Sequence, residues 1–84
     1  MNVYVKAIID NEKVYLRSIF PIIWDPFISG AMKFSSVEEA RLALNCAYKH
    51  LFNNEQFTLE ALYSIHFVGV VNGDVSFNEP YLYK

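Results

Sequence analysis

The chain has a single cysteine, Cys46, among its 84 residues, which excludes an internal disulfide framework. A lone cysteine is typical of proteins in a reducing interior. The longest apolar run is far shorter than the roughly 20 residues that cross a membrane, and the alternating residues 1–10 do not have the pattern of a signal peptide. Repeats, low-complexity stretches and linkers are also missing. We therefore expect one domain, residues 1–84, with no membrane segment.

Neither sign of charge dominates. Seven Lys and Arg residues oppose nine Asp and Glu residues, for a net charge of −2, and the charges are dispersed along the chain. Direct binding of nucleic acid is not expected, because such proteins carry clustered basic residues. The acidity is also too weak for a surface that mimics a phosphate backbone.

Sequence signatures of catalysis are absent as well: there is no P-loop, dinucleotide fingerprint or nucleophile elbow. We expect no cofactor and no enzymatic activity. One alternative stays open, since Cys46 and His50 share a helical face and, with His66, offer groups for a metal site or a thiol enzyme. A closed zinc site needs four ligands, however, so the pattern favours ordinary surface roles for these three residues.

What the chain has in excess is apolar surface, at 54% hydrophobic and 17% aromatic residues. A chain of this length buries only about 60% of its unfolded surface. One helix on one sheet face cannot easily cover so many apolar side chains. We infer a second covered surface, formed by a homodimer or by another protein.

Residues 35–52 form the one segment with a clear helical pattern. Ser35 and Ser36 each stand three residues before a glutamate, the spacing of a capping box. An apolar stripe follows at helical spacing: it consists of Val37, Ala40, Leu44, Ala47, Tyr48 and Leu51. The pattern predicts a helix packed on a sheet.

The other segments predict strands. Residues 3–9 and 14–20 alternate and should form a hairpin around a turn at 10–13, and residues 22–24 resume as a short edge piece after Pro21. Residues 57–71 form the longest predicted strand, with a bulge near Gly69 or a late start. Asn72-Gly73 predicts a type I′ turn into a last strand at 74–78, and the tail at 81–84 should dock on the body.

These elements together predict an α+β fold. An antiparallel sheet of four to five strands carries one helix on one face, in the order ββ(β)αββ.

The aromatic residues give the strongest indication of function, because they cannot all be core in so small a domain. Tyrosine, tryptophan and arginine are the usual anchors of protein interfaces. The predicted partner-binding residues are Tyr4, Tyr15, Arg17, Trp24, Phe27, His66, Tyr81 and Tyr83. The alternative is that several of them cover the second sheet face inside a homodimer.

The order of elements, with a helix that opens as Met32-Lys33-Phe34-Ser35-Ser36-Val37-Glu38-Glu39-Ala40, resembles small proteins of bacterial viruses and mobile elements. Anti-CRISPR inhibitors are frequent among such proteins. The resemblance implies a cytoplasmic protein of a bacterial host that inhibits a host defence nuclease by occluding a protein surface. The alternative is a homodimeric structural or regulatory protein without inhibitor activity.

Overall fold

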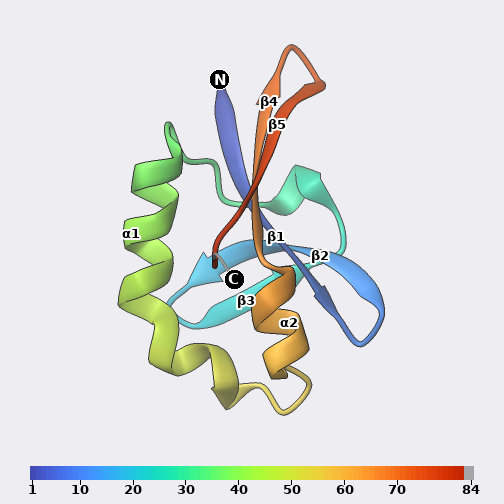
Figure 1. Ribbon diagram of the computed structural model, residues 1–84, viewed down its shortest axis with the longest axis vertical. Helices are drawn as coiled ribbons and strands as arrows, with labels where there is room; N and C mark the ends of the chain where they lie inside the picture. Colours follow the sequence, from blue (N-terminus) through green and yellow to red (C-terminus); the bar gives the residue numbers. More distant parts are fainter. Residues whose placement is uncertain (83–84) are drawn as a thin grey trace.

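The computed structural model describes residues 1–82 as a five-stranded antiparallel sheet with two α-helices (Figure 1). The sheet order is β3-β2-β1-β4-β5, so the first strand lies in the centre. The strands are β1 (Asn2–Ile9), β2 (Glu12–Ile19), β3 (Ile22–Asp25), β4 (His66–Val71) and β5 (Asp74–Pro80); the helices are α1 (Val37–Ala47) and α2 (Leu59–Ser64), with 3-10 segments η1 (Ile28–Gly30) and η2 (Tyr48–Asn53). The predicted α+β fold is confirmed, and α2 is an addition to it.

A tight turn connects the two strands in each of the long hairpins, β1–β2 and β4–β5. Asn72 and Gly73 have φ angles of 51° and 84°, which are the left-handed values that a type I′ turn requires. The turn predicted from this dipeptide is therefore confirmed. Asp10 and Asn11 also have positive φ angles, 53° and 65°, so the β1–β2 connection is shorter than the predicted 10–13 turn and β2 begins at Glu12.

Helix α1 begins where the serines predict. The side chain of Ser36 accepts a hydrogen bond from the Glu39 backbone N–H at 3.1 Å, and the Ser35 hydroxyl donates to the Glu39 carboxylate. The helix continues as η2 to Asn53, so the helical segment ends close to the predicted boundary. Its core-facing residues are Ala40, Leu44, Ala47 and Leu51.

The prediction of a single strand over residues 57–71 is wrong in its first half. Residues 59–64 form α2 instead, and β4 starts at His66. A strand would place Leu59 and Tyr63 on one face with the buried Phe57 and Ala61, yet the side chains of Leu59 and Tyr63 are 63% and 51% exposed.

The true period in this segment is helical. The buried residues are Phe57, Ala61, Leu62 and Ile65, which lie four, one and three residues apart, as on one side of a helix. The Thr58 hydroxyl accepts a hydrogen bond from the Ala61 N–H at 3.2 Å and so caps the helix. At the other end, the Ser64 hydroxyl accepts from the Ile8 N–H at 2.8 Å, which satisfies a β1 donor beyond the end of the β1–β4 ladder.

The hairpin of β4 and β5 projects beyond the helices (Figure 1); we call residues 66–80 the arm. Both expected irregularities are present: β4 starts late, and a register shift lies between Gly69 and Val70. Gly69 pairs with Phe77, and a Cβ atom added at Gly69 would lie 2.1 Å from the Phe77 ring. Glycine is therefore required here so that the ring can lie directly over the backbone.

The helices and the main core lie on the sheet face that carries the odd-numbered residues of β1. The fully or nearly fully buried strand residues of this core are Val3, Val5, Ala7, Ile9, Val14, Leu16 and Phe67. The even-numbered residues of β1 point to the opposite side. We call that side the helix-free face.

A bulge at Arg17 changes the alternation of β2. Leu16 pairs with Trp24 and Ser18 with Ile23, so Arg17 is an extra residue in β2. As a result Ile19 packs against the core while Phe20 is 76% exposed. Strict alternation from Val14 and Leu16 would place Ser18 and Phe20 on the core side, but the extra residue reverses the faces after position 17.

Candidate protein-binding face

A row of polar and aromatic side chains crosses four strands of the helix-free face. His66 on β4 pairs with Lys6 on β1, Lys6 pairs with Tyr15 on β2, and Tyr15 pairs with Asp25 on β3. Directly paired residues project to the same side of a sheet. With neighbouring strands about 4.8 Å apart, the row spans about 14 Å.

A second line of side chains runs along β2 through the same tyrosine. Lys13 and Arg17 stand two residues before and after Tyr15, and alternate residues of a strand share a face. Each is about 7 Å from Tyr15 along the strand. We call these residues the cationic face: Lys6, Lys13, Tyr15, Arg17 and His66.

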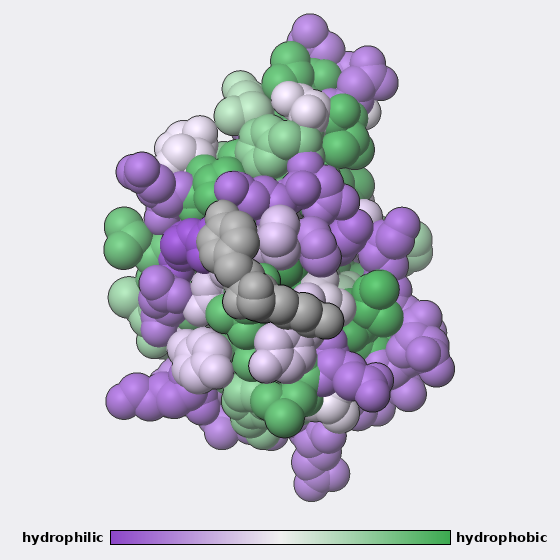
Figure 2. Space-filling model, in the orientation of Figure 1, coloured by the Kyte–Doolittle hydropathy of each residue, from purple (hydrophilic) through white to green (hydrophobic). Residues whose placement is uncertain are grey.

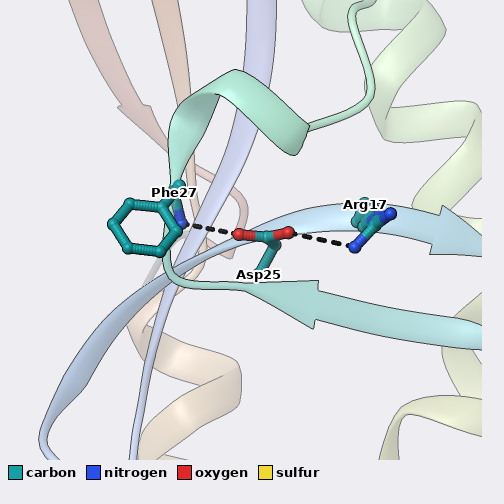
Figure 3. Close-up of polar contacts among 3 residues, drawn as sticks. All are labelled: Arg17, Asp25 and Phe27. Atoms are coloured by element: carbon teal, nitrogen blue, oxygen red, sulfur yellow. Dashed lines mark hydrogen bonds and ion pairs between the residues drawn. The ribbon is translucent and has the colours of Figure 1, made fainter.

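Asp25, an acid on this face, is already bonded within the protein (Figure 3). Its Oδ2 accepts from Arg17 Nη1 at 3.3 Å, and its Oδ1 accepts from the Phe27 backbone N–H at 2.7 Å. The Asp25 side chain is only 15% exposed, whereas that of Arg17 is 59% exposed. Asp25 therefore orients Arg17 while the guanidinium stays open to solvent.

Charge is thus distributed unevenly. The chain carries a net charge of −2, yet the cationic face has three of its Lys and Arg residues. Among the strand residues of this face in positions 1–82, the pairing places a single acid, Asp25. The other acids of β1–β5 lie at strand ends or turns, or pair with residues of the helix side, as Glu12 does with Ile9. The fold thereby creates a positive surface on an acidic protein.

Four of the eight predicted binding residues lie at or beside this surface. Tyr15 and His66 are half-buried and Arg17 is exposed. Phe27 is 70% exposed, and its backbone is fixed by Asp25. The imidazole Nδ1 of His66 lies 2.8 Å from the Ser64 carbonyl oxygen, which holds the ring at the start of β4.

Three other predicted binding residues are buried or half-buried; one of them, Tyr4, is buried on the helix-free face itself, where it pairs with Val68. Tyr4 and Tyr81 are 7% and 5% exposed, so the expectation that they form an open surface is corrected. Trp24 is half-buried on the helix side, where its ring stacks on Phe57 with centroids 6.0 Å apart. These aromatic rings stabilise the fold, because each is largely removed from water. The eighth residue, Tyr83, lies outside the described residues.

Tyr81 fastens the end of the chain to α1. Its hydroxyl donates to Asn45 Oδ1 at 2.5 Å, and its carbonyl accepts from Arg41 Nη1 at 2.7 Å. The Arg41 guanidinium also lies over the Phe67 ring, 5.0 Å from its centroid. Burial raises the pKa of the Tyr81 hydroxyl, Tyr48 raises it further and Arg41 lowers it. The docking of the tail that the sequence predicts is confirmed at Tyr81.

Sequence reasoning missed three residues of this surface, namely Lys6, Lys13 and Asp25. Each looks like an ordinary strand or turn residue in the linear sequence. The alternation of residues 3–9 was a usable signal for Lys6, because it already placed this residue opposite the core. Lys13 falls in the predicted 10–13 turn, whereas the structure places it in β2, paired with Ile8. The position of Asp25 on this face follows only from the β2–β3 register, in which it pairs with Tyr15.

The arm presents a second exposed surface, of apolar character. The side chains of Met1, Val71 and Val75 are 62%, 42% and 66% exposed. Asn2 pairs with Val70, so the start of β1 lies beside the arm. Figure 2 shows apolar surface over the arm, with hydrophilic residues at its tip.

The residues of the metal or thiol alternative are not gathered in one place. Cys46 is exposed on α1, on the helix side of the sheet, whereas His66 belongs to the helix-free face. His50 borders an open groove of about 430 Å³ between η2 and the β2–β3 turn, together with Phe20 and Pro21. Within residues 1–82, the side chains of His, Cys, Asp and Glu form no group of three or more that could hold a metal ion.

Over the same residues, neither helix has the length and apolar character needed to cross a membrane. Comparison of the chain with protein-family models, with curated proteins and with solved structures found no match.

Proposed function

We propose that the chain is a non-enzymatic protein-binding module that occludes the surface of its partner with the cationic face. The observation that carries this proposal is the position of Lys6, Lys13 and Arg17 around Tyr15 on the sheet face opposite the two α-helices. Arginine and tyrosine are enriched among the residues that dominate binding energy. A net-negative protein gains little stability from such a cluster, so recognition explains it better.

The ion pair with Asp25 makes Arg17 a suitable anchor. Ordering a long side chain on binding costs about 0.5–1.5 kcal/mol. Because Asp25 already orients the guanidinium at 3.3 Å, part of that cost is met before the partner arrives. Phe27, whose backbone N–H is bound by the same carboxylate, adds an exposed ring on the other side of Asp25 (Figure 3).

The test compares two variants with the same change in net charge. Lys13→Glu/Arg17→Gln alters the cationic face, and Lys33→Glu/Lys49→Gln alters exposed residues elsewhere. Each tagged protein is used to capture partners from a bacterial lysate, followed by quantitative mass spectrometry. We expect a partner that wild type and control capture and the face variant loses, at unchanged thermal stability. Equal capture by both variants would contradict the proposal.

The identity of the partner as a host defence nuclease stays a prediction. It follows from the resemblance to anti-CRISPR inhibitors and places the protein in the bacterial cytoplasm. A phage-plaquing assay in a host with an active defence nuclease tests it. Expression of the wild type and of Lys33→Glu/Lys49→Gln should restore plaques, whereas Lys13→Glu/Arg17→Gln should not. Failure of the wild type to restore plaques would exclude inhibition of that nuclease.

A homodimer is the second candidate, and the arm favours it. The arm carries exposed Val71 and Val75, with Met1 at the adjoining start of β1, and β5 is an edge strand of the sheet that residues 1–82 form. An exposed edge strand is a ready site for strand pairing. Light scattering at micromolar concentration decides the matter: a mass of about twice 9.7 kDa supports the dimer, and a strict monomer contradicts it.

A further inference from the structure

We infer that the surface recognised by the cationic face is a protein segment rich in aspartate and glutamate. The inference rests on the proposed function and specifies the chemistry of the partner. Its basis is charge complementarity: Lys6, Lys13 and Arg17 flank one tyrosine, and the nearby acid is already bonded to Arg17 and Phe27. His66 lies beside Lys6 in the next strand.

The spacing of the cations suits separate carboxylates. Lys13 and Arg17 lie about 14 Å apart along β2, with Tyr15 between them. An extended segment rises about 3.4 Å per residue, so acids about four residues apart on the partner could meet both cations. Arg17 offers its remaining donors to one carboxylate, and the hydroxyl of Tyr15 can donate to a second acid or to a backbone carbonyl.

A nucleic acid fits this surface less well than an acidic protein segment does. The cations extend over only about 14 Å, whereas a phosphate backbone continues with charge at every nucleotide. Beyond the face the chain has surplus acid, including the exposed Asp10 and Glu12 next to Lys13. A long polyanion would meet these carboxylates and be repelled, while a short acidic segment would not.

The apolar neighbours of the cations support the same conclusion. Ile8 is 48% exposed on this face, beside Lys13 in the β1–β2 ladder. Farther along the sheet, Val70 pairs with Val75 on the same side as His66. Mixed apolar and cationic surface is typical of protein interfaces, in which apolar side chains of the partner cover the area around the ion pairs.

The experiment titrates isotope-labelled protein with three probes and records amide chemical shifts by NMR. The probes are an extended peptide of about eight residues with alternating Glu and Ser, its Gln counterpart, and an oligothymidylate of similar length. We expect the Glu peptide to shift amides of β1, β2 and the start of β4, and to bind more tightly than the other two. Its affinity should fall about tenfold between about 25 and about 250 mM NaCl, since the screening length drops from about 20 Å to about 6 Å, below the width of the face.

The charge variants complete the test. Lys13→Glu/Arg17→Gln should abolish the shifts, and Lys33→Glu/Lys49→Gln should retain them. Equal binding of the Gln peptide, tighter binding of the oligothymidylate, shifts confined to another surface, or no binding of the Glu peptide would each overturn the inference. If the Glu peptide fails while a captured partner still depends on Lys13 and Arg17, the inference falls and the proposed function stands; if capture is also independent of these residues, both fall.

Discussion

The effect of Gly69→Ala on stability should change sign depending on whether the Phe77 ring lies over position 69. A Cβ atom at position 69 would lie 2.1 Å from Cε2 and 2.5 Å from Cδ2 of Phe77, which is far inside van der Waals contact. The ring belongs to an edge strand and can move only by leaving the core against which it packs. We therefore expect Gly69→Ala to destabilise the protein by about 1–3 kcal/mol, the usual cost of overpacking.

The same substitution should be favourable when the ring is removed. Gly69 does not have a positive φ angle, so an alanine there is not strained by the backbone. In a strand alanine is better than glycine by about 0.5–1 kcal/mol, because the unfolded chain has less freedom to lose. In a Phe77→Ala background, Gly69→Ala should thus stabilise the protein. The coupling energy between the two positions is then about 1.5–4 kcal/mol.

Urea unfolding of the four proteins measures this cycle. For 84 residues, 1–3 kcal/mol corresponds to a shift in Tm of roughly 6–17 °C. If Phe77→Ala does not fold, Phe77→Leu serves as the second background, since a leucine can rotate away from the new methyl group. An equal cost of Gly69→Ala with and without the ring would refute the reasoning.

Three further predictions concern the cap of α2, the ion pair and the tail. Thr58→Ala should cost about 1 kcal/mol in urea unfolding, because it leaves the Ala61 N–H without its cap, whereas Thr58→Ser should be nearly neutral. Arg17→Ala should lower the free energy of unfolding by less than about 1 kcal/mol, because the guanidinium is exposed. Asp25→Ala should lower it by about 2 kcal/mol, because it also removes the acceptor of the Phe27 N–H. Equal losses in the two variants would contradict this. The third prediction follows from the raised pKa of the Tyr81 hydroxyl, whose proton the unfolded chain loses at a lower pH than the folded protein does. The free energy of unfolding should therefore decline as the pH rises above about 10. In Tyr81→Phe this decline should be less steep.

The parts of the fold that follow from local chemistry could be predicted from the sequence. Ser36 and Glu39 define the start of α1 through contacts within one turn, and Asn72-Gly73 defines a type I′ turn through its φ angles alone. Neither depends on distant residues. The strands of the first hairpin were predictable for a similar reason, since their alternation matches the two faces of the sheet.

Helix α2 could not be distinguished from a strand by periodicity alone. In residues 57–65 the alternate positions happen to be apolar, and so are the positions at helical spacing. Only the exposure of Leu59 and Tyr63 decides between the two readings. Thr58 is a local signal for the helix, because a threonine at this position can serve as its N-cap before Glu60 and Ala61.

The candidate site depends on register, which a single sequence does not specify. Lys6 and His66 are sixty positions apart in the chain and become neighbours only because β4 inserts beside β1. The aromatic composition predicts an open surface for Tyr81, whereas the fold brings it to Arg41 and Asn45 on α1. A buried site for a tyrosine hydroxyl requires a partner from another element, and that partner is set by tertiary packing.

The bulge at Arg17 connects the fold to the proposed function. Without the extra residue, β2 and β3 would stay in one register, and Phe20 rather than Ile19 would point toward the core. With it, Ile19 and Ile22 pair on the core side. Arg17 remains on the side of Tyr15, within 3.3 Å of Asp25. An insertion that leaves Phe20 76% exposed gives no evident gain in stability, but it orients a cation on the open face of the sheet. Bulges are often used to redirect a side chain near functional sites, and the position of this one supports the proposal that the helix-free face, rather than the helices, meets a partner.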